Sequence, residues 1–302
     1  MVFASRARYY VILLVAILSV STAGTVFKKI HSRTLLKAWW RLFSTSFWLG
    51  IGFWYQNRNA NDELKRRYYQ RKTGLLLLGS GLALSAHFGT WIASLDLTSL
   101  AHSLLVVSCH PLILVAYLLA CGKHISRLEL GGLFLGLIGM GVFLLDVQSD
   151  QEVTIAGDFF ALLGAATFVV YMLVGSHLRK WVPLFMYAFP VTFIGSCPLL
   201  IGAMLAYGGD IEYTGVSTDS IWGLFGVAFP YVLFLSVVPG ILGHTGFNYT
   251  VERLSPLIIC VALTTEPVFG TIIGMMFGEA DTPGVWTLIG ACAAVSDAGI
   301  AR

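Results

Sequence analysis

The apolar residues of this chain come in blocks of about 20, long enough to cross a hydrocarbon core of roughly 30 Å as an α-helix. Of its 302 residues, 57% are hydrophobic and only 12% are charged, whereas a soluble domain has about 25% charged residues. The alternation over about 10 residues that is typical of an outer-membrane β-barrel strand is absent. The sequence therefore predicts an all-α polytopic membrane protein.

Ten transmembrane helices are predicted from these blocks. The expected spans are 9–27, 36–55, 74–95, 99–121, 129–146, 156–176, 183–206, 229–250, 255–278 and 283–301. The first apolar run follows Arg6 and Arg8 and could instead be a cleaved signal peptide. Because its apolar character continues to Phe27 and the next block follows closely, a retained span is favoured.

The charges predict the orientation of these spans. With the N-terminus inside, 14 of the 19 Lys and Arg residues fall on the cytoplasmic side, counting both termini, which is the positive-inside asymmetry. Both termini are thus predicted to be cytoplasmic, in a plasma membrane or, alternatively, an organelle membrane. The exception is the first external turn, which carries Lys28, Lys29, Arg33, Lys37 and Arg41. Some of these side chains are expected to reach the membrane surface or to line a pathway.

The two halves of the chain resemble each other. At an offset of 156 residues, His110-Pro111 falls on Glu266-Pro267, and Ser99 falls on Ser255. Residues 8–147 and 155–301 each carry five predicted spans, so the two copies would enter the membrane in opposite orientations. Such inverted-topology repeats recur in secondary transporters. The expected fold is therefore ten transmembrane helices arranged as two inverted five-helix repeats.

Two long stretches carry a resemblance to a known family. The stretch "HFGTWIASLDLTSLAHSLLVVSCHPLILVAYLLACGK" resembles the first EamA-type repeat of the drug/metabolite transporter superfamily. The stretch "GHTGFNYTVERLSPLIICVALTTEPVFGTIIGMMFGE" resembles the second repeat, with its serine-proline turn, glutamate-proline pair and glycine-glutamate exit. The resemblance implies ten helices, two EamA domains and transport of small organic solutes, often efflux. His110 departs from the pattern, because first repeats usually carry a small polar residue there.

Glu266 is the leading candidate for a functional residue. It lies near the middle of the predicted span 255–278, where an ionised side chain is costly and normally faces the bundle interior or a wet cavity. Pro267 cannot donate a backbone hydrogen bond and should break the helix. His110 and Pro111 repeat this arrangement in the first half. Glu266, with His110, is expected to bind a polar or cationic solute group or to carry a coupling proton; the alternative is a structural contact between helices.

Five further side chains are candidates for solute contact. His87 and Trp91 are four residues apart, as are His244 and Asn248, so each pair shares one helix face; Tyr249 follows directly. Aromatic and polar groups on one buried face suit an organic solute. The alternative is hydrogen bonding between helices.

Two sets of glycines predict close helix packing. They are Gly132 and Gly136 in one span, and Gly270, Gly274 and Gly278 in another. Small residues spaced by four let helix backbones approach. The contact is expected within one chain, although the same stripes could pair two copies as a homodimer.

The sequence predicts a secondary active transporter of small organic solutes that works by alternating access, by proton-coupled efflux or by exchange. No zinc-protease or serine-hydrolase motif and no Walker-type loop is present, so an enzyme, a cofactor, a metal site and a nucleic-acid partner are not expected. The expected partners are the lipid bilayer and a small-molecule solute. The alternative functions are an oligomeric membrane channel and a non-transporting receptor.

Overall fold

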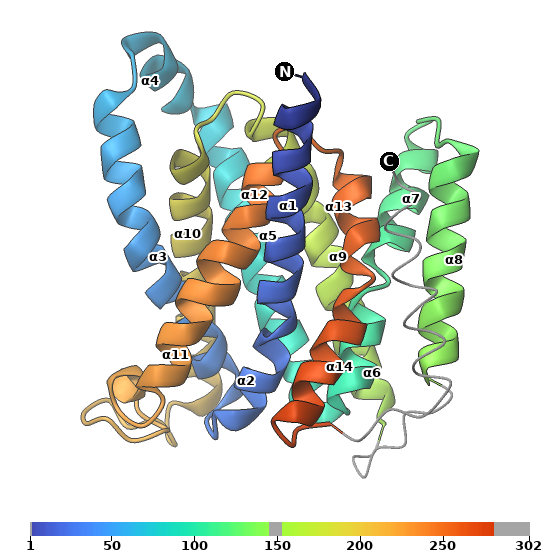
Figure 1. Cartoon of the computed structure of the whole chain (residues 1–302). Helices are drawn as coiled ribbons and strands as arrows, with labels where there is room; N and C mark the ends of the chain where they lie inside the picture. The colour runs from blue at the N-terminus through green and yellow to red at the C-terminus, as the bar shows by residue number, and fades with distance from the viewer. Residues whose placement is uncertain (1, 145–152, 281–302) are drawn as a thin grey trace.

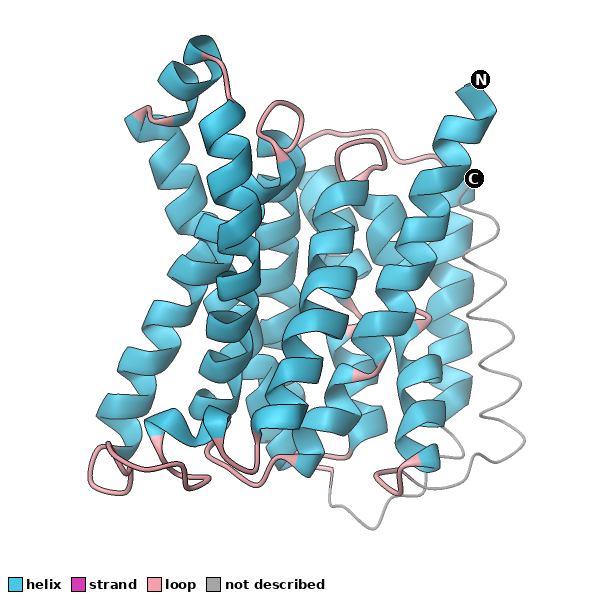
Figure 2. Ribbon diagram, turned by 60° about the vertical axis from the view of Figure 1, so that its left-hand side comes forward, coloured by secondary structure: helices cyan, strands magenta, loops and turns pink. Residues whose placement is uncertain are grey.

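The structure is a computed structural model that describes residues 2–144 and 153–280. The predicted last span, 283–301, lies outside the described residues. Within them the chain is a bundle of helices joined by short turns and one longer loop (Figure 2). The first half contains α1 (Val2–Ser21), α2 (Ala23–Lys29), α3 (Thr34–Asn59), α4 (Asp62–Tyr68), α5 (Arg71–Leu97), α6 (Leu100–Val107), α7 (His110–Ala120) and α8 (Arg127–Leu144). The second half contains α9 (Ile155–Leu178), α10 (Leu184–Tyr207), the 3₁₀ turn η1 (Ile221–Phe225), α11 (Phe229–Leu235), the π-helical η2 (Ser236–Thr245), α12 (Gly246–Thr250), α13 (Pro256–Leu263) and α14 (Glu266–Met276).

Seven helical stretches within the described residues are long and apolar enough to cross a membrane. They are Ala7–Lys29, Arg71–Leu97, Leu100–Ala120, Ile155–Leu178, Leu184–Tyr207, Phe229–Thr250 and Pro256–Met276. Two further predicted spans correspond to α3 and α8, which are helical but are not among these seven. The charged Lys37 and Arg41 lower the apolar character of α3. The chain is therefore an integral, multi-pass, all-α membrane protein.

The long helical stretches run alternately up and down the bundle (Figure 1). One end of the bundle holds α4 and the turns α7–α8, α9–α10 and α12–α13; we call it the inner end, because it is the predicted cytoplasmic side. The outer end holds the turns α2–α3 and α5–α6 and the loop between α10 and α11. Helix α5 packs along α9, α10 packs against α3 and α5, and α1 packs against η2. Helices distant in sequence thus surround a common interior.

Two of the membrane-long stretches are broken at corresponding points. The break between α6 and α7 falls at residues 108–109, and the break between α13 and α14 falls at 264–265, so the two are 156 residues apart. All four helix boundaries obey the same offset. So do the serines that accept a hydrogen bond at the start of each stretch, Ser99 and Ser255, and the positive-φ glycines that end them, Gly122 and Gly278. Figure 1 shows the two broken stretches running in opposite directions.

The break in the first half is closed by a side chain. Pro111 has no N–H to donate to the carbonyl of Val107, four residues earlier. The Nδ1–H of His110 donates to that carbonyl instead, at 2.8 Å. This satisfies a polar group that would otherwise be costly to bury in a membrane.

Gly270 and Gly274 lie where helices approach closely. A Cβ at Gly270 would stand 2.6 Å from Leu104 Cδ1 of α6, and one at Gly274 would stand 2.7 Å from Leu100 Cδ2. Gly278 differs, because it forms the turn after α14 with φ of 73° and no described heavy atom lies within 4 Å of its Cβ position. The side-chain surroundings of Gly132 and Gly136 lie outside the described part, although both residues belong to α8.

Replacing Gly270 by valine should destabilise the protein, because the added methyl groups would overlap Leu104. Overpacking of this kind typically costs about 1–3 kcal/mol, and the midpoint of thermal unfolding of the purified protein should fall accordingly. Gly79→Val is the matched control, because Gly79 also lies in a helix and its Cβ would meet nothing within 4 Å. An equal loss for both variants would contradict the packing assigned to Gly270.

Candidate functional site

A small cavity lies in the bundle interior at the level of the two helix breaks. Its water-accessible volume is about 30 Å³, enough for a few water molecules. It is lined by Val20, Ala23, Arg41, His87, Trp91, Val107, His110, Phe168, His244, Phe247, Leu263 and Glu266. These residues come from both halves of the chain, and both broken stretches contribute their first residue after the break.

Five of the seven candidate residues meet at this cavity: Glu266, His110, His87, Trp91 and His244. His110 is the first residue of α7 and Glu266 is the first residue of α14. The helix breaks therefore bring one titratable side chain from each half to the same cavity. No hydrogen bond or ion pair of the Glu266 carboxylate is formed within the described part of the chain.

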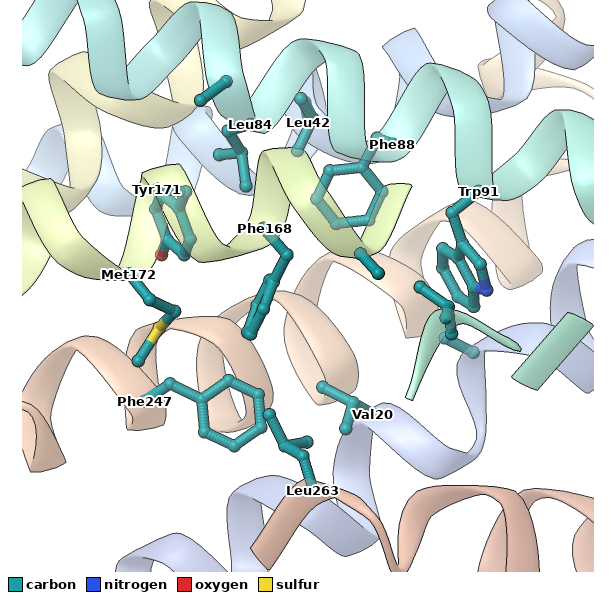
Figure 3. Packing of buried hydrophobic residues seen from close by; sticks show 14 of the residues in the cluster. Val20, Leu42, Leu84, Phe88, Trp91, Phe168, Tyr171, Met172, Phe247 and Leu263 are labelled. Atoms are coloured by element: carbon teal, nitrogen blue, oxygen red, sulfur yellow. The ribbon is translucent and has the colours of Figure 1, made fainter. Parts of the chain in front are cut away.

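The cavity is walled by rings from several helices. His110 lies 5.1 Å from Phe168, measured between ring centroids, and His87 lies 5.2 Å from the same ring. His244 lies 6.0 Å from His87 and 5.9 Å from Phe247. Figure 3 shows Phe168 of α9 and Phe247 of α12 between Val20 and Leu263 on one side and the α5 side chains on the other. Such walls suit an apolar or aromatic group of a solute.

Arg41 is a charged cavity residue that the sequence pointed to only as one of five basic residues, some of which were expected to line a pathway. Its side chain is only 1% exposed, and its guanidinium carbon lies 4.2 Å from the centre of the Phe88 ring. One terminal nitrogen donates to the carbonyl of Pro239 in η2 at 3.3 Å. A lone arginine inside an apolar span is a functional signal in its own right, and here it was hidden among the basic residues of the first external turn. Phe168 and Phe247 carried no signal, because aromatic residues in apolar helices usually serve packing.

Three buried nitrogen atoms that belong to cavity residues lack a hydrogen-bond partner in the described structure. They are Arg41 Nη1, Trp91 Nε1 and His244 Nδ1. Buried polar atoms are nearly always hydrogen-bonded, and leaving one unpaired costs about 1–3 kcal/mol. Their side chains all line the same cavity.

Asn248 and Tyr249 do not line the cavity. The Asn248 side chain accepts a hydrogen bond from the Tyr171 hydroxyl at 2.7 Å, which joins α12 to α9. Tyr249 stacks on Tyr9 with ring centroids 5.3 Å apart, and the guanidinium of Arg8 lies 5.8 Å from its ring centre. Both residues therefore contact neighbouring helices toward the inner end.

Ion pairs close the bundle at its outer end. Lys37 contacts Asp96 at 2.7 Å, Lys29 contacts Glu279 at 2.9 Å, and Arg33 contacts Asp210 at 3.4 Å. Three basic residues of the first external turn are thus neutralised by acids on other outer segments. These pairs explain three of the five basic residues that depart from the positive-inside pattern. A fourth, Arg41, lies one helical turn beyond Lys37 and lines the cavity.

The inner end is held by Arg179 at the end of α9. It contacts Glu252 at 2.7 Å and donates to the backbone carbonyl of Asn248 at 2.8 Å. The Arg179 side chain is 3% exposed, so this pair is largely shielded from water. Charged contacts between helices are therefore present at both ends of the bundle.

The fold defines the chain as a polytopic helical membrane protein. Residues 155–298 match the EamA-like transporter family, and this match confirms the resemblance to the drug/metabolite transporter superfamily. One protein of known crystal structure superposes with a TM-score of 0.72 at 18% sequence identity, and the match covers 98% of this chain and 96% of that one. This likeness concerns the fold alone. No curated protein matches the chain significantly in sequence.

The Lys37–Asp96 pair should contribute measurably to stability, because the Lys37 side chain is only 4% exposed. Asp96→Asn would leave the buried ammonium without its counter-charge, at a cost of about 1–3 kcal/mol. The double variant Lys37→Met/Asp96→Asn should recover most of that loss. Thermal unfolding of the single and double variants measures the coupling, and strictly additive effects would contradict the proposed importance of this pair.

Proposed function

We propose that this protein is a secondary active transporter of small organic solutes that works by alternating access between two inverted five-helix repeats. The observation that carries the proposal is the meeting of two broken helices, 156 residues apart in sequence, around one cavity. Discontinuous helices at mid-membrane are a recurrent way of building transporter sites, because they place polar groups where a continuous helix offers none.

The agreement between the halves supports the assignment of repeats at 8–147 and 155–301. Within the two broken stretches, the helix boundaries, helix breaks, capping serines and exit glycines obey one offset, and the stretches run in opposite directions (Figure 1). A duplication that retains so many local features in opposite orientation favours two elements that exchange conformations. The family match covers residues 155–298, and the assignment of 8–147 as a repeat rests on this correspondence.

The contacts at the two ends support a closed, solute-protecting form. Opening toward the outside would separate Lys37 from Asp96 and Lys29 from Glu279, and opening toward the inside would separate Arg179 from Glu252. Each set of contacts joins different helices. Once the charged side chains are exposed, water can replace their ion-pair contacts at a small cost in free energy. The bundle would alternate by breaking one set while it keeps the other.

Glu266 is proposed as the coupling group. In the first half, His110 donates a hydrogen to the carbonyl that Pro111 leaves free. In the second half, the corresponding carbonyl is that of Leu263, and an ionised Glu266 has no hydrogen to donate. A protonated Glu266 would have one. Protonation would therefore let the second broken helix adopt the arrangement of the first, which links a proton to the shape of the cavity.

The alternative functions receive less support. A channel needs a continuous pore lined by rings of polar groups, whereas this cavity is small and enclosed by aromatic rings and charged contacts. A receptor needs no pair of oppositely directed broken helices. The membrane that holds the protein, the side of its termini and a homodimeric state remain predictions from the sequence.

Glu266→Gln should fold normally and lose proton-driven transport. The glutamine amide can donate to the Leu263 carbonyl as a protonated glutamate would, so the unfolding midpoint should not fall. The measurement is uptake into proteoliposomes, with and without a pH gradient, of the solute that most stabilises the purified protein. We expect accumulation driven by the gradient to drop at least about tenfold, the scale of one proton-transferring group.

Glu63→Gln is the matched control, because Glu63 lies on the exposed helix α4. It makes the same chemical change outside the cavity and should transport like the wild-type protein. Retention of full gradient-driven accumulation by Glu266→Gln would contradict the assignment of Glu266. A solute flux that does not saturate with concentration in the wild-type protein would favour the channel instead.

A further inference from the structure

Arg41 is the one permanently charged cation in the cavity lining, and its charge is not matched by a bonded acid. Of the residues that line the cavity, Arg41 and Glu266 carry opposite charges, yet no ion pair joins them within the described residues. The guanidinium is instead stabilised by the Phe88 ring and by a single backbone carbonyl. A buried charge with so few compensating contacts is costly unless a ligand completes them.

The unpaired atoms near Arg41 are hydrogen-bond donors. Arg41 Nη1 and Trp91 Nε1 are both buried and without a partner, and both nitrogens can only donate. Both side chains pack against the same two rings. The Phe27 ring centre is 5.6 Å from the Arg41 guanidinium carbon and 5.8 Å from the Trp91 ring centre. The Phe88 ring centre is 4.2 Å from the guanidinium carbon and 6.2 Å from the Trp91 ring centre. Two buried donors beside the same rings, one of them cationic, are best matched by an anionic acceptor.

We propose that Arg41 and Trp91 form an anion subsite that binds the carboxylate of a small organic acid, with the rest of the solute lying against the ring wall of Phe168 and Phe247. This inference rests on the proposed transport function and names the chemical class of its solute. The planar guanidinium suits the two oxygens of a carboxylate, and the enclosed volume of about 30 Å³ accommodates a group of that size rather than a whole solute.

The charges around the cavity are consistent with this class. Arg41 and an ionised Glu266 sum to zero, so a bound carboxylate would leave one excess negative charge in a low-dielectric site. A proton on Glu266 removes that charge, and so does an ammonium group on the solute itself. In the first case the protonation of Glu266, at the start of α14, is linked to the anion held by Arg41 on α3.

The test compares ligands that differ only in the anionic group. Purified wild-type protein is heated in the presence of acetate or phenylacetate, each set against its amide, and of phenylalanine set against phenylalaninamide. Sodium chloride at equal ionic strength is the reference, and phenethylamine is included as a cation without a carboxylate. A ligand that binds the folded state raises the unfolding midpoint in proportion to its saturation. We expect at least one acid to raise it while its amide does not.

The variants locate the effect. Arg41→Gln should lower the apparent affinity of the protein for the acid at least about tenfold, which is the usual consequence of losing a charge-assisted hydrogen bond. Arg41→Lys keeps the charge but not the paired donors and should lose less, while Trp91→Phe removes only the indole donor. Arg71→Gln, at an exposed site at the start of α5, is the matched control and should bind like the wild type. Because the acid and amide comparison uses unaltered protein, a folding defect in Arg41→Gln would not remove the test.

Several outcomes would overturn the anion subsite. They are equal stabilisation by acid and amide, stabilisation by chloride alone, or no stabilisation by any acid. Stabilisation by phenethylamine alone, abolished by Glu266→Gln, would also overturn it while leaving the proposed transport function intact. Saturable counterflow in proteoliposomes that is unchanged in Arg41→Gln would likewise overturn the anion subsite and leave the proposed transport function intact. Absence of saturable flux for every stabilising ligand would instead count against the transport function itself.

Discussion

The constraint on which this structure depends is that no backbone polar group can be left unpaired in the hydrocarbon region. A proline two residues into a helix segment breaks that rule locally, and the chain does so twice, at Pro111 and Pro267. Of the residues at the two breaks, Ser108, Thr264 and Thr265 are buried in the bundle and Cys109 is half-buried. Once two breaks are buried together, the helices around them must enclose a polar space, and the cavity follows from that requirement.

The same constraint explains why the charged residues are arranged as they are. Lys37 and Arg41 lie one turn apart on α3, but they meet different surroundings. Lys37 finds Asp96 at the outer end, whereas Arg41 is held by aromatic faces and a carbonyl in the interior. The basic turn that seemed to contradict the orientation of the chain therefore divides into an outer set of ion pairs and one interior cation. In the proposed mechanism its charges serve closure and binding rather than topology.

Much of the architecture could be predicted from the sequence because it depends on short-range patterns. Apolar block length fixed the helical spans, and the offset of 156 located both breaks before Pro111 and Pro267. The cavity was only partly predictable. Glu266, His110, His87, Trp91 and His244 stand out as polar or amphipathic residues in apolar helices, but Asn248 satisfies its amide with Tyr171. That outcome depends on the rotation of α9 relative to α12, which tertiary packing decides. Arg41 was obscured by its basic neighbours, and Phe247 by its ordinary composition.

The difference between the two halves matters as much as their similarity. Where the first half places a histidine that donates to the carbonyl freed by Pro111, the second places an acid that can do so only when protonated. A perfect duplication would give two identical breaks and no means of linking occupancy of the cavity to a proton. With His110 in one half and Glu266 in the other, the two broken helices of the proposed site would respond differently to protonation. A site that couples solute binding to a proton requires such a difference between two otherwise equivalent breaks. The break at His110 can keep its hydrogen bond while the break at Glu266 gains or loses one with the proton.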